Sequence, residues 1–194
     1  MALLNTLSSL ATFVAGFLTA IFAEPIRQKI YRPVLELEFE KNEYFVTKTD
    51  EGDPPTDRAQ YIRVKATNVK PRIAKRCRAY LIDVARLGPT GSWEATDYCD
   101  CIQLSWSAHP GENYEALDLS QGVPFFVDVL STRRSANSFR PALAFTPYRF
   151  QHLFSTPATY RFTVLVTGDN VKSARLNISF KWTGIWDQFE VSVV

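Results

Sequence analysis

Five basic side chains within nine consecutive positions form the densest chemical feature of the sequence: Lys70, Arg72, Lys75, Arg76 and Arg78. Guanidinium and ammonium groups donate hydrogen bonds to phosphate and carboxylate oxygens, and anionic lipid headgroups attract such clusters near a membrane. The set therefore predicts a site for a small anionic ligand or for lipid headgroups. The alternative is a solvated turn whose charge is balanced by nearby acids, for which the obvious candidates are Glu36, Glu38 and Glu40.

A second basic segment has the same chemistry. Arg133, Arg134 and Arg140 lie in a serine-rich stretch, residues 131–141, that predicts an exposed loop with affinity for anions. The whole chain carries a formal charge of only +2, which is too small to attract nucleic acid through a global field. The expected partners are therefore a membrane, a protein or a small anion, and not nucleic acid.

The cysteines and histidines do not form a recognisable reactive site. Cys99 and Cys101 flank a single aspartate, and Cys77 stands apart. A structural zinc site takes four ligands, and only His109 and His152 remain to complete one, without regular spacing. The sequence also contains no nucleophile elbow, phosphate-cradling glycine loop or metal-ligand helix. We therefore expect reduced thiols, no catalytic residue, no cofactor and no metal.

The elements that position these residues begin with an uncharged N-terminal segment. Residues 2–23 contain no charged side chain. At about 1.5 Å per residue, a helix of this length spans the roughly 30 Å hydrocarbon core of a bilayer. The segment lacks the basic start and small-residue cleavage site of a signal peptide, and it lacks the charged face of an interfacial helix. We therefore expect a membrane-spanning helix and a juxtamembrane elbow over residues 1–33.

The basic residues beside this segment predict its orientation. Arg27, Lys29 and Arg32 follow the expected span, and no basic residue precedes it. Lysine and arginine accumulate on the cytoplasmic side of a span. We therefore expect a single-pass membrane protein whose C-terminal domain is cytoplasmic. A periplasmic or extracellular adhesion-type domain is the alternative, and it requires the opposite topology.

The expected helix sorts its residues by size. At about 100° per residue, one half of its circumference collects small residues that include Ser8, Ala11, Thr12, Ala15, Gly16, Thr19 and Ala20. Small residues let helix backbones approach closely in lipid, and serine and threonine add interhelical hydrogen bonds. The face predicts a homo-oligomer formed through the N-terminal helix. An unassociated anchor, or one paired with another protein, is the alternative.

The remaining residues, 34–194, alternate apolar and polar side chains in short runs separated by turn residues. The clearest runs are residues 34–40, 61–68, 74–87, 160–167, 174–182 and 189–193. This pattern, without a helical period between the runs, predicts a mainly β fold, an antiparallel sandwich of immunoglobulin-like type. Two polar stretches, residues 48–58 and 131–141, are expected to be loops. Tyr160, early in a late strand, is a candidate tyrosine corner or a simple core aromatic.

Two segments are similar to bacterial membrane-anchored proteins with immunoglobulin-like domains. Residues 61–84 read YIRVKATNVKPRIAKRCRAYLIDV, and residues 159–187 read TYRFTVLVTGDNVKSARLNISFKWTGIWD. The shared pattern is a strand, an asparagine, a turn, an Ala-Lys-x-Cys motif and a further strand. The resemblance implies this fold and no activity.

These features together predict a membrane-anchored, oligomeric binding or sensor module whose β domain binds a protein or a small anionic ligand. In a more specific version, the clustered helices perturb the membrane, as in a defence effector. The alternative is a passive structural anchor or accessory subunit that docks a larger partner at the membrane.

Overall fold

The computed structural model describes Phe17, Ala23 and residues 31–51, 56–107, 114–136 and 138–194, and its contacts divide the chain between Arg32 and Pro33. The expected membrane span, residues 2–23, lies outside the described residues except for Phe17 and Ala23. The predicted packing face lies wholly outside them: Ser8, Ala11, Thr12, Ala15, Gly16, Thr19 and Ala20. Among the described residues, no helix has the length and apolar character that crossing a membrane requires.

The C-terminal unit is mainly antiparallel β structure. Over its described residues, twelve strands and one short 3₁₀ helix follow one another: β1 (Leu35–Glu38), β2 (Val46–Glu51), β3 (Asp57–Asn68), β4 (Ala74–Leu87), β5 (Trp93–Ala95), β6 (Ile102–Trp106), β7 (Leu117–Leu119), β8 (Pro124–Arg133), β9 (Phe139–Pro141), η1 (Tyr148–Phe154), β10 (Ala158–Thr167), β11 (Ala174–Ile185) and β12 (Gln188–Val193). The prediction of a mainly β, antiparallel fold is confirmed.

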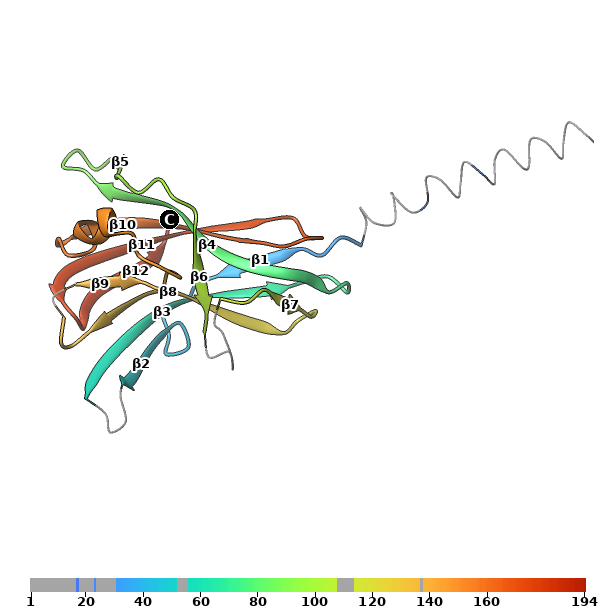
Figure 1. The fold of residues 1–194 in the computed structure, drawn as a ribbon, viewed down its shortest axis with the longest axis horizontal. Helices are drawn as coiled ribbons and strands as arrows, with labels where there is room; N and C mark the ends of the chain where they lie inside the picture. Colours follow the sequence, from blue (N-terminus) through green and yellow to red (C-terminus); the bar gives the residue numbers. More distant parts are fainter. Residues whose placement is uncertain (1–16, 18–22, 24–30, 52–55, 108–113, 137) are drawn as a thin grey trace, which may run out of the picture. The chain divides into compact units, whose positions relative to one another are not determined.

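The strands form one curled sheet in the order β1-β3-β8-β6-β4-β10-β11-β12 (Figure 1). β2 pairs with β3, β9 with β8, and both β5 and β7 with β4. β6 joins the two halves, because Ile102 faces Leu81 of β4 while Trp106 faces Val127 of β8. A sheet that curls in this way brings the inner faces of its two halves together over one core.

The core is built from the alternating residues that the sequence shows. In β10, Tyr160, Phe162 and Val164 are buried, and β11 buries Ile178 and Phe180. Phe139 of β9 lies among five aromatic rings at centroid distances of 5.0 to 6.0 Å, which belong to Phe154, Tyr160, Phe162, Phe180 and Trp182. Each such pair contributes about 0.5–1.5 kcal/mol beyond the burial of apolar area.

The expectation of a loop over residues 131–141 is therefore wrong at both of its ends. β8 continues to Arg133, and β9 begins at Phe139, which is completely buried. The three-residue strand β9 is too short to show an alternating pattern. Its pairing with Leu130, Ser131 and Thr132 of β8 determines its structure.

The expected loop over residues 48–58 is also strand at both of its ends, and residues 52–55 between them lie outside the described residues. β2 extends to Glu51 and β3 begins at Asp57, so the two form a long hairpin paired from Val46–Ile62 to Glu51–Asp57. The Tyr61 hydroxyl donates to Glu51 Oε1 over 2.5 Å, and the Arg58 Nε lies 3.1 Å from Asp50 Oδ1. The pairing of backbone groups along β3 supplies the structure, so the polar side chains of β2 need no apolar period.

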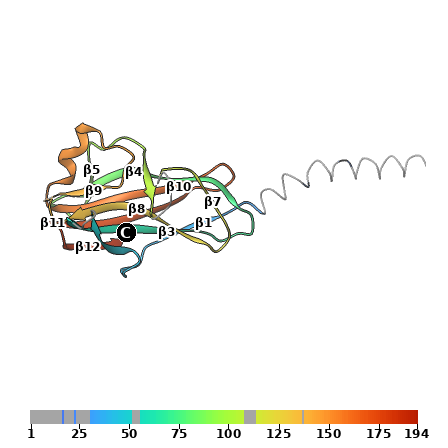
Figure 2. The same cartoon turned by 60° about the horizontal axis from the view of Figure 1, so that its bottom comes forward.

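The β unit has two ends, which the turns between strands define. Val34 precedes β1 at one end, which also holds the β3–β4, β7–β8 and β10–β11 turns, because Asn68 bridges to Gln121 and Val34 to Lys172. We call this the Val34 end. The helix η1, with β5 and β9, lies at the opposite end, which we call the η1 end (Figures 1 and 2).

Candidate functional site

The Val34 end joins segments that are far apart in the sequence. The carbonyl oxygen of Val34 accepts a hydrogen bond from the Val69 N–H over 2.9 Å, and Val34 also forms a parallel bridge with Lys172. The Gly122 N–H donates to the Asn68 carbonyl over 2.9 Å. These contacts bring the β3–β4, β7–β8 and β10–β11 turns to the place where the chain enters the β unit.

Asn68 holds two of these turns together from inside. Its side chain is completely buried, and Nδ2 donates to the carbonyls of Arg72 and Leu119 over 2.7 and 3.0 Å. Its Oδ1 accepts from the Lys70 N–H over 3.1 Å. A buried amide with these bonds is satisfied and therefore structural, and it sets the path of the turn that carries Lys70 and Arg72.

Asn170 plays the same role from the β10–β11 turn. Its Nδ2 donates to the Ile73 carbonyl over 2.9 Å, and its Oδ1 accepts from the Lys75 N–H over 2.8 Å. Gly168 permits this contact, since a Cβ there would lie 2.5 Å from the Lys75 carbonyl oxygen. The two asparagines thus fix the backbone on both sides of the basic turn.

Arg76 differs from the other members of the predicted set. It has a positive φ of 50° at an irregularity between Ala74 and Cys77 in the pairing of β4 with β7. Its N–H donates to Asp118 Oδ1 over 2.8 Å, and its Nε lies 3.8 Å from Asp169 Oδ2. Acidic groups therefore balance Arg76, and its strained backbone serves the local bulge.

The remaining four members are not balanced in this way. Lys70 and Lys75 are exposed, while Arg72 and Arg78 are half-buried. Among the described residues, none of these four forms an ion pair, and the acids Glu36, Glu38 and Glu40 make no salt bridge with them. Glu38 pairs instead with Lys65 on β3. Arg78 lies further along β4, opposite Thr167, so Lys70, Arg72 and Lys75 form the centre of the set.

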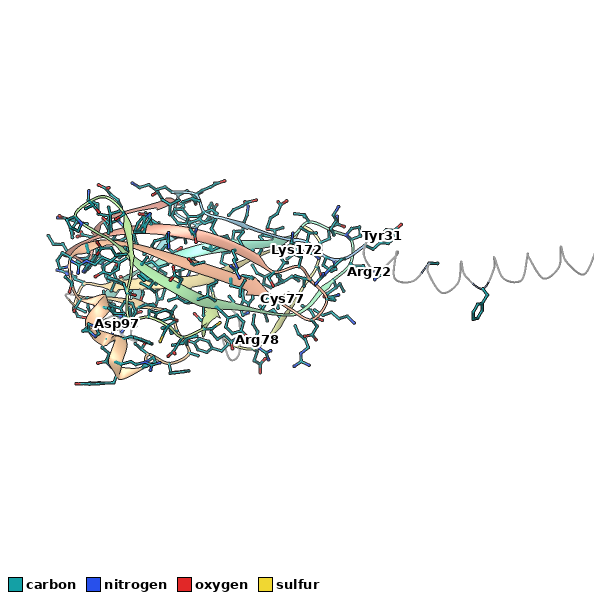
Figure 3. The ribbon with its side chains drawn as sticks, turned by 90° about the horizontal axis from the view of Figure 1, so that it is seen from above. Tyr31, Arg72, Cys77, Arg78, Asp97 and Lys172 are labelled. Carbon is teal, nitrogen blue, oxygen red and sulfur yellow. The ribbon has the colours of Figure 1, made fainter. Side chains whose placement is uncertain are left out.

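The structure adds residues that the sequence did not single out. Lys172 lies near Arg72 at the Val34 end, whereas Asp97 lies at the other end (Figure 3). Ile73 and Val123, from two adjoining turns, are exposed to 46% and 45%. No sequence signal links Lys172 or Val123 to the basic turn, because only the folded chain brings them together. We call Lys70, Arg72, Ile73, Lys75, Val123 and Lys172 the Val34-end surface.

This surface is positively charged and partly apolar. Residues 69–76 contain four basic residues and no acid, residues 120–123 are uncharged, and residues 168–173 contain one aspartate and one lysine. Cations around exposed aliphatic side chains are the composition that binds the interface of an anionic membrane.

The second basic segment lies at the η1 end, away from this surface. Arg133 pairs with Glu51 over 3.2 Å, while Arg140 lines a pocket of about 410 Å³ beside η1. Buried Phe139 and Phe154 form part of its wall, together with Ser138, Thr146 and Gln151. The fold therefore separates the two basic segments that the sequence marks as candidate anion sites.

The thiols also lie apart. Cys77 is buried under the β10–β11 turn, and burial, with smaller contributions from Asp118 and Asp169, raises its pKa to about 12. Cys99 and Cys101 are exposed at the η1 end, on either side of Asp100, whose carboxylate accepts two hydrogen bonds from Arg149 over 2.6 and 2.7 Å.

The structure describes one of the two histidines. His152 lies 3.8 Å from Asp97. His109 lies outside the described residues. The expectation that neither contributes to a metal or catalytic site stays a prediction.

Comparison with protein-family models, with curated proteins and with solved structures finds no match to this chain. The charge of the Val34-end surface and its exposed aliphatic side chains are therefore the guide to the function of the chain.

Proposed function

We propose that the chain is a single-pass, membrane-anchored binding module that rests its Val34-end surface on anionic lipid headgroups. One observation carries the proposal. Basic side chains without acidic partners among the described residues surround Ile73 and Val123 at the end where Pro33 and Val34 begin the β unit. The uncharged segment 2–23 ends ten positions before Pro33, so the expected anchor and the start of the β unit are close along the chain.

The expected energy suits such a role. Each lysine or arginine near an anionic leaflet is worth about 1 kcal/mol. Lys70, Arg72, Lys75 and Lys172 together therefore stabilise an oriented domain by roughly 4 kcal/mol at most. That is modest for recruitment from solution, but it suffices to orient a domain that a span already holds at the surface. Arg27, Lys29 and Arg32 favour the cytoplasmic leaflet, which carries the anionic lipid.

We assign the β unit to the immunoglobulin-like sandwiches. The support is that β6 links two halves over one core, and that the buried Tyr160 donates from its hydroxyl to the Thr156 carbonyl over 2.7 Å. A tyrosine corner makes such a bond to the backbone a few residues upstream.

Assembly through the small-residue face of segment 2–23 completes the proposal. Clustering of the spans would bring several β units together, and in its most specific form it would perturb the membrane as a defence effector does. Gly16→Leu widens the packing face and should weaken cross-linked oligomers in membranes, while Leu18→Ala, on the opposite face, should not. Oligomers unchanged by Gly16→Leu would contradict this step, and a chain that stays monomeric until a partner is added would identify a passive anchor.

Hydrogen exchange of the full chain in nanodiscs tests the surface directly. Backbone amides of residues 69–76 and 168–173 should exchange more slowly in discs containing phosphatidylglycerol than in discs of phosphatidylcholine alone. The triple variant Lys70→Glu, Arg72→Glu, Lys75→Glu should remove this difference. Arg134→Glu with Arg140→Glu reverses charges at the η1 end and should preserve it. Equal exchange in both lipids, or an effect of the control variant as large as that of the triple variant, would refute the proposal.

A further inference from the structure

The curled sheet has an open seam between its two edges. One edge consists of β1 and β2, which both pair with β3, and the other edge is β12. At the Val34 end the seam narrows, since Val34 bridges to Lys172 just before β11. Within the described residues, β12 pairs with β11 alone, so one side of its backbone has no strand partner.

The register shows which groups of β12 face the seam. Val194 lies opposite Asn177 in the register of β11 with β12 and donates from its N–H to the Asn177 carbonyl over 3.2 Å. Alternate residues of an antiparallel pair turn their backbone groups toward the partner strand or away from it. Phe189, Val191 and Val193 therefore direct their N–H and carbonyl groups to the open edge. An exposed edge of this kind is a template for another strand.

The side chains of the same strand line a pocket in the seam. Phe189 and Val191 of β12 face Val46 of β2 across a space of about 220 Å³. Pockets that hold a whole small-molecule ligand are usually about 300–1,000 Å³. The volume instead suits the side chains of a chain segment that lies along β12. A second pocket, of about 380 Å³, continues along the seam past Trp186 and shares Asp187 with the first.

Gln60 provides an independent sign of a ligand. Its side chain is only 4% exposed and lines the smaller pocket from the inner face of β3. Among the described residues, its carboxamide makes no hydrogen bond, and its polar atoms are not among the fully enclosed ones, so the amide is open to the pocket. A carboxamide offers one acceptor and two donor hydrogens, which match the carbonyl and N–H of a peptide backbone.

The charges of the seam select the kind of peptide. Lys41 and Asp187 both line the smaller pocket. Asp187 also lines the larger pocket, together with Lys48 and the ion pair of Arg58 with Asp50. Three cations, Lys41, Lys48 and Arg58, thus face two acids, Asp50 and Asp187, which leaves a net charge of +1, so the seam suits a strand of little or no net charge. A strand added to β12 would place every second side chain beside Phe189 and Val191, and those side chains are expected to be apolar.

We propose that the seam binds an extended, uncharged peptide of a partner protein, which adds to the free edge of β12 and hydrogen-bonds to Gln60. This goes beyond membrane anchoring, because neither pocket of the seam shares a residue with the Val34-end surface. Backbone pairing supplies the affinity, and the pocket selects apolar residues at alternate positions, as in other complexes formed by strand addition.

Selection from a phage library of random nine-residue peptides tests the site, with the full chain in neutral-lipid nanodiscs as the target. Enriched peptides should be uncharged and apolar at every second position. Val193→Pro removes one N–H that faces the seam and should weaken their binding threefold to tenfold, while Val193→Ala keeps the N–H and should bind nearly as wild type. Gln60→Leu, which fills the same space without the amide, should weaken binding by a similar factor.

Three results would overturn the proposal. One is the absence of any enriched peptide, and the second is equal affinity for wild type, Val193→Pro and Gln60→Leu. The third is cross-linking of β12 to β12 between copies without added peptide, lost in Val193→Pro, which would assign the edge to a second copy of this chain. Because neutral lipid is used, failure of this test leaves the lipid experiment unaffected.

Discussion

The side-chain oxygen of Asn170 accepts a 2.8 Å hydrogen bond from the Lys75 N–H, across 95 residues of sequence. Its amide nitrogen donates to the Ile73 carbonyl. One side chain from the β10–β11 turn thereby holds both flanks of Ala74, where the basic turn becomes β4. The Val34-end surface depends on this contact, because the turn has no regular structure of its own.

Asn170→Ala removes both hydrogen bonds, which are exposed, so the expected cost is that of two lost bonds between the β10–β11 turn and the basic turn. We expect a loss of about 1–2 kcal/mol in the free energy of unfolding, measured by urea titration with tryptophan fluorescence. Ser173→Ala removes the exposed bond to Thr167 Oγ1 in the same turn and should change stability by less than about 0.5 kcal/mol. An equal effect of the two substitutions would contradict the role of Asn170.

Gly168→Ala tests the close approach of the same turn to β4. The new Cβ would meet the Lys75 carbonyl oxygen at 2.5 Å and Cys77 Sγ at 3.0 Å, and backbone cannot move aside as a flexible side chain can. We expect destabilisation of about 1–3 kcal/mol in thermal or urea unfolding. Gly88→Ala is the matched control, since its Cβ would meet only the movable end of Glu94. A larger effect at Gly88 than at Gly168 would refute the packing argument.

The Arg63–Asp128 pair should make stability depend on pH. Arg63 Nε lies 2.8 Å from Asp128 Oδ1, and the side chains are only 19% and 11% exposed. Burial raises the pKa of Asp128, and Arg63 opposes that rise. An unfolded aspartate has a pKa of about 3.9. When the folded state has a higher pKa, the free energy of unfolding is greatest below about pH 3.9 and falls as the pH rises through the folded pKa. Arg63→Ala should raise the pKa of Asp128 further, because it removes the cation that lowers it.

Arg63→Ala should therefore cost about 3 kcal/mol at pH 7 and clearly less near pH 4, in urea titrations at the two pH values. Arg58→Ala breaks a pair whose side chains are 65% and 55% exposed, and it should cost less than about 1 kcal/mol at either pH. A pH-independent loss in Arg63→Ala would show that its contribution is packing rather than charge.

The three thiols should differ in reactivity. A maleimide at pH 7 should label Cys99 and Cys101 in the folded chain, and Cys77 only after unfolding, as mass spectrometry of the peptides can show. The raised pKa of Cys77, about 12, also stabilises the fold at neutral pH relative to alkaline pH. That contribution is lost as the pH rises from about 8.5 towards 12. Cys77→Ala should flatten the fall in stability over this range, and an unchanged fall would contradict the assignment.

The sequence by itself determined the class of the fold and the position of most strands. Alternation such as that of residues 174–182 is local, because successive side chains of a strand point to opposite faces whatever the strand pairs with. The observed bounds of β4, Ala74–Leu87, therefore coincide with the run that the alternation predicts. The basic cluster was also visible, since its members are neighbours along the chain.

Pairing between strands in the tertiary structure decided which segments without an apolar–polar alternation become strands, and which distant residues lie together. The polar strand β2 and the three-residue β9 exist because β3 and β8 offer free backbone groups beside them. Only the folded chain brings Lys172 to the Val34 end, beside the basic turn, and Gln60 to the same pocket as Phe189. The residues of each pair are about a hundred positions or more apart in the sequence. Such contacts depend on the order and curl of the strands, which many weak long-range interactions set together, so no short stretch of sequence contains them.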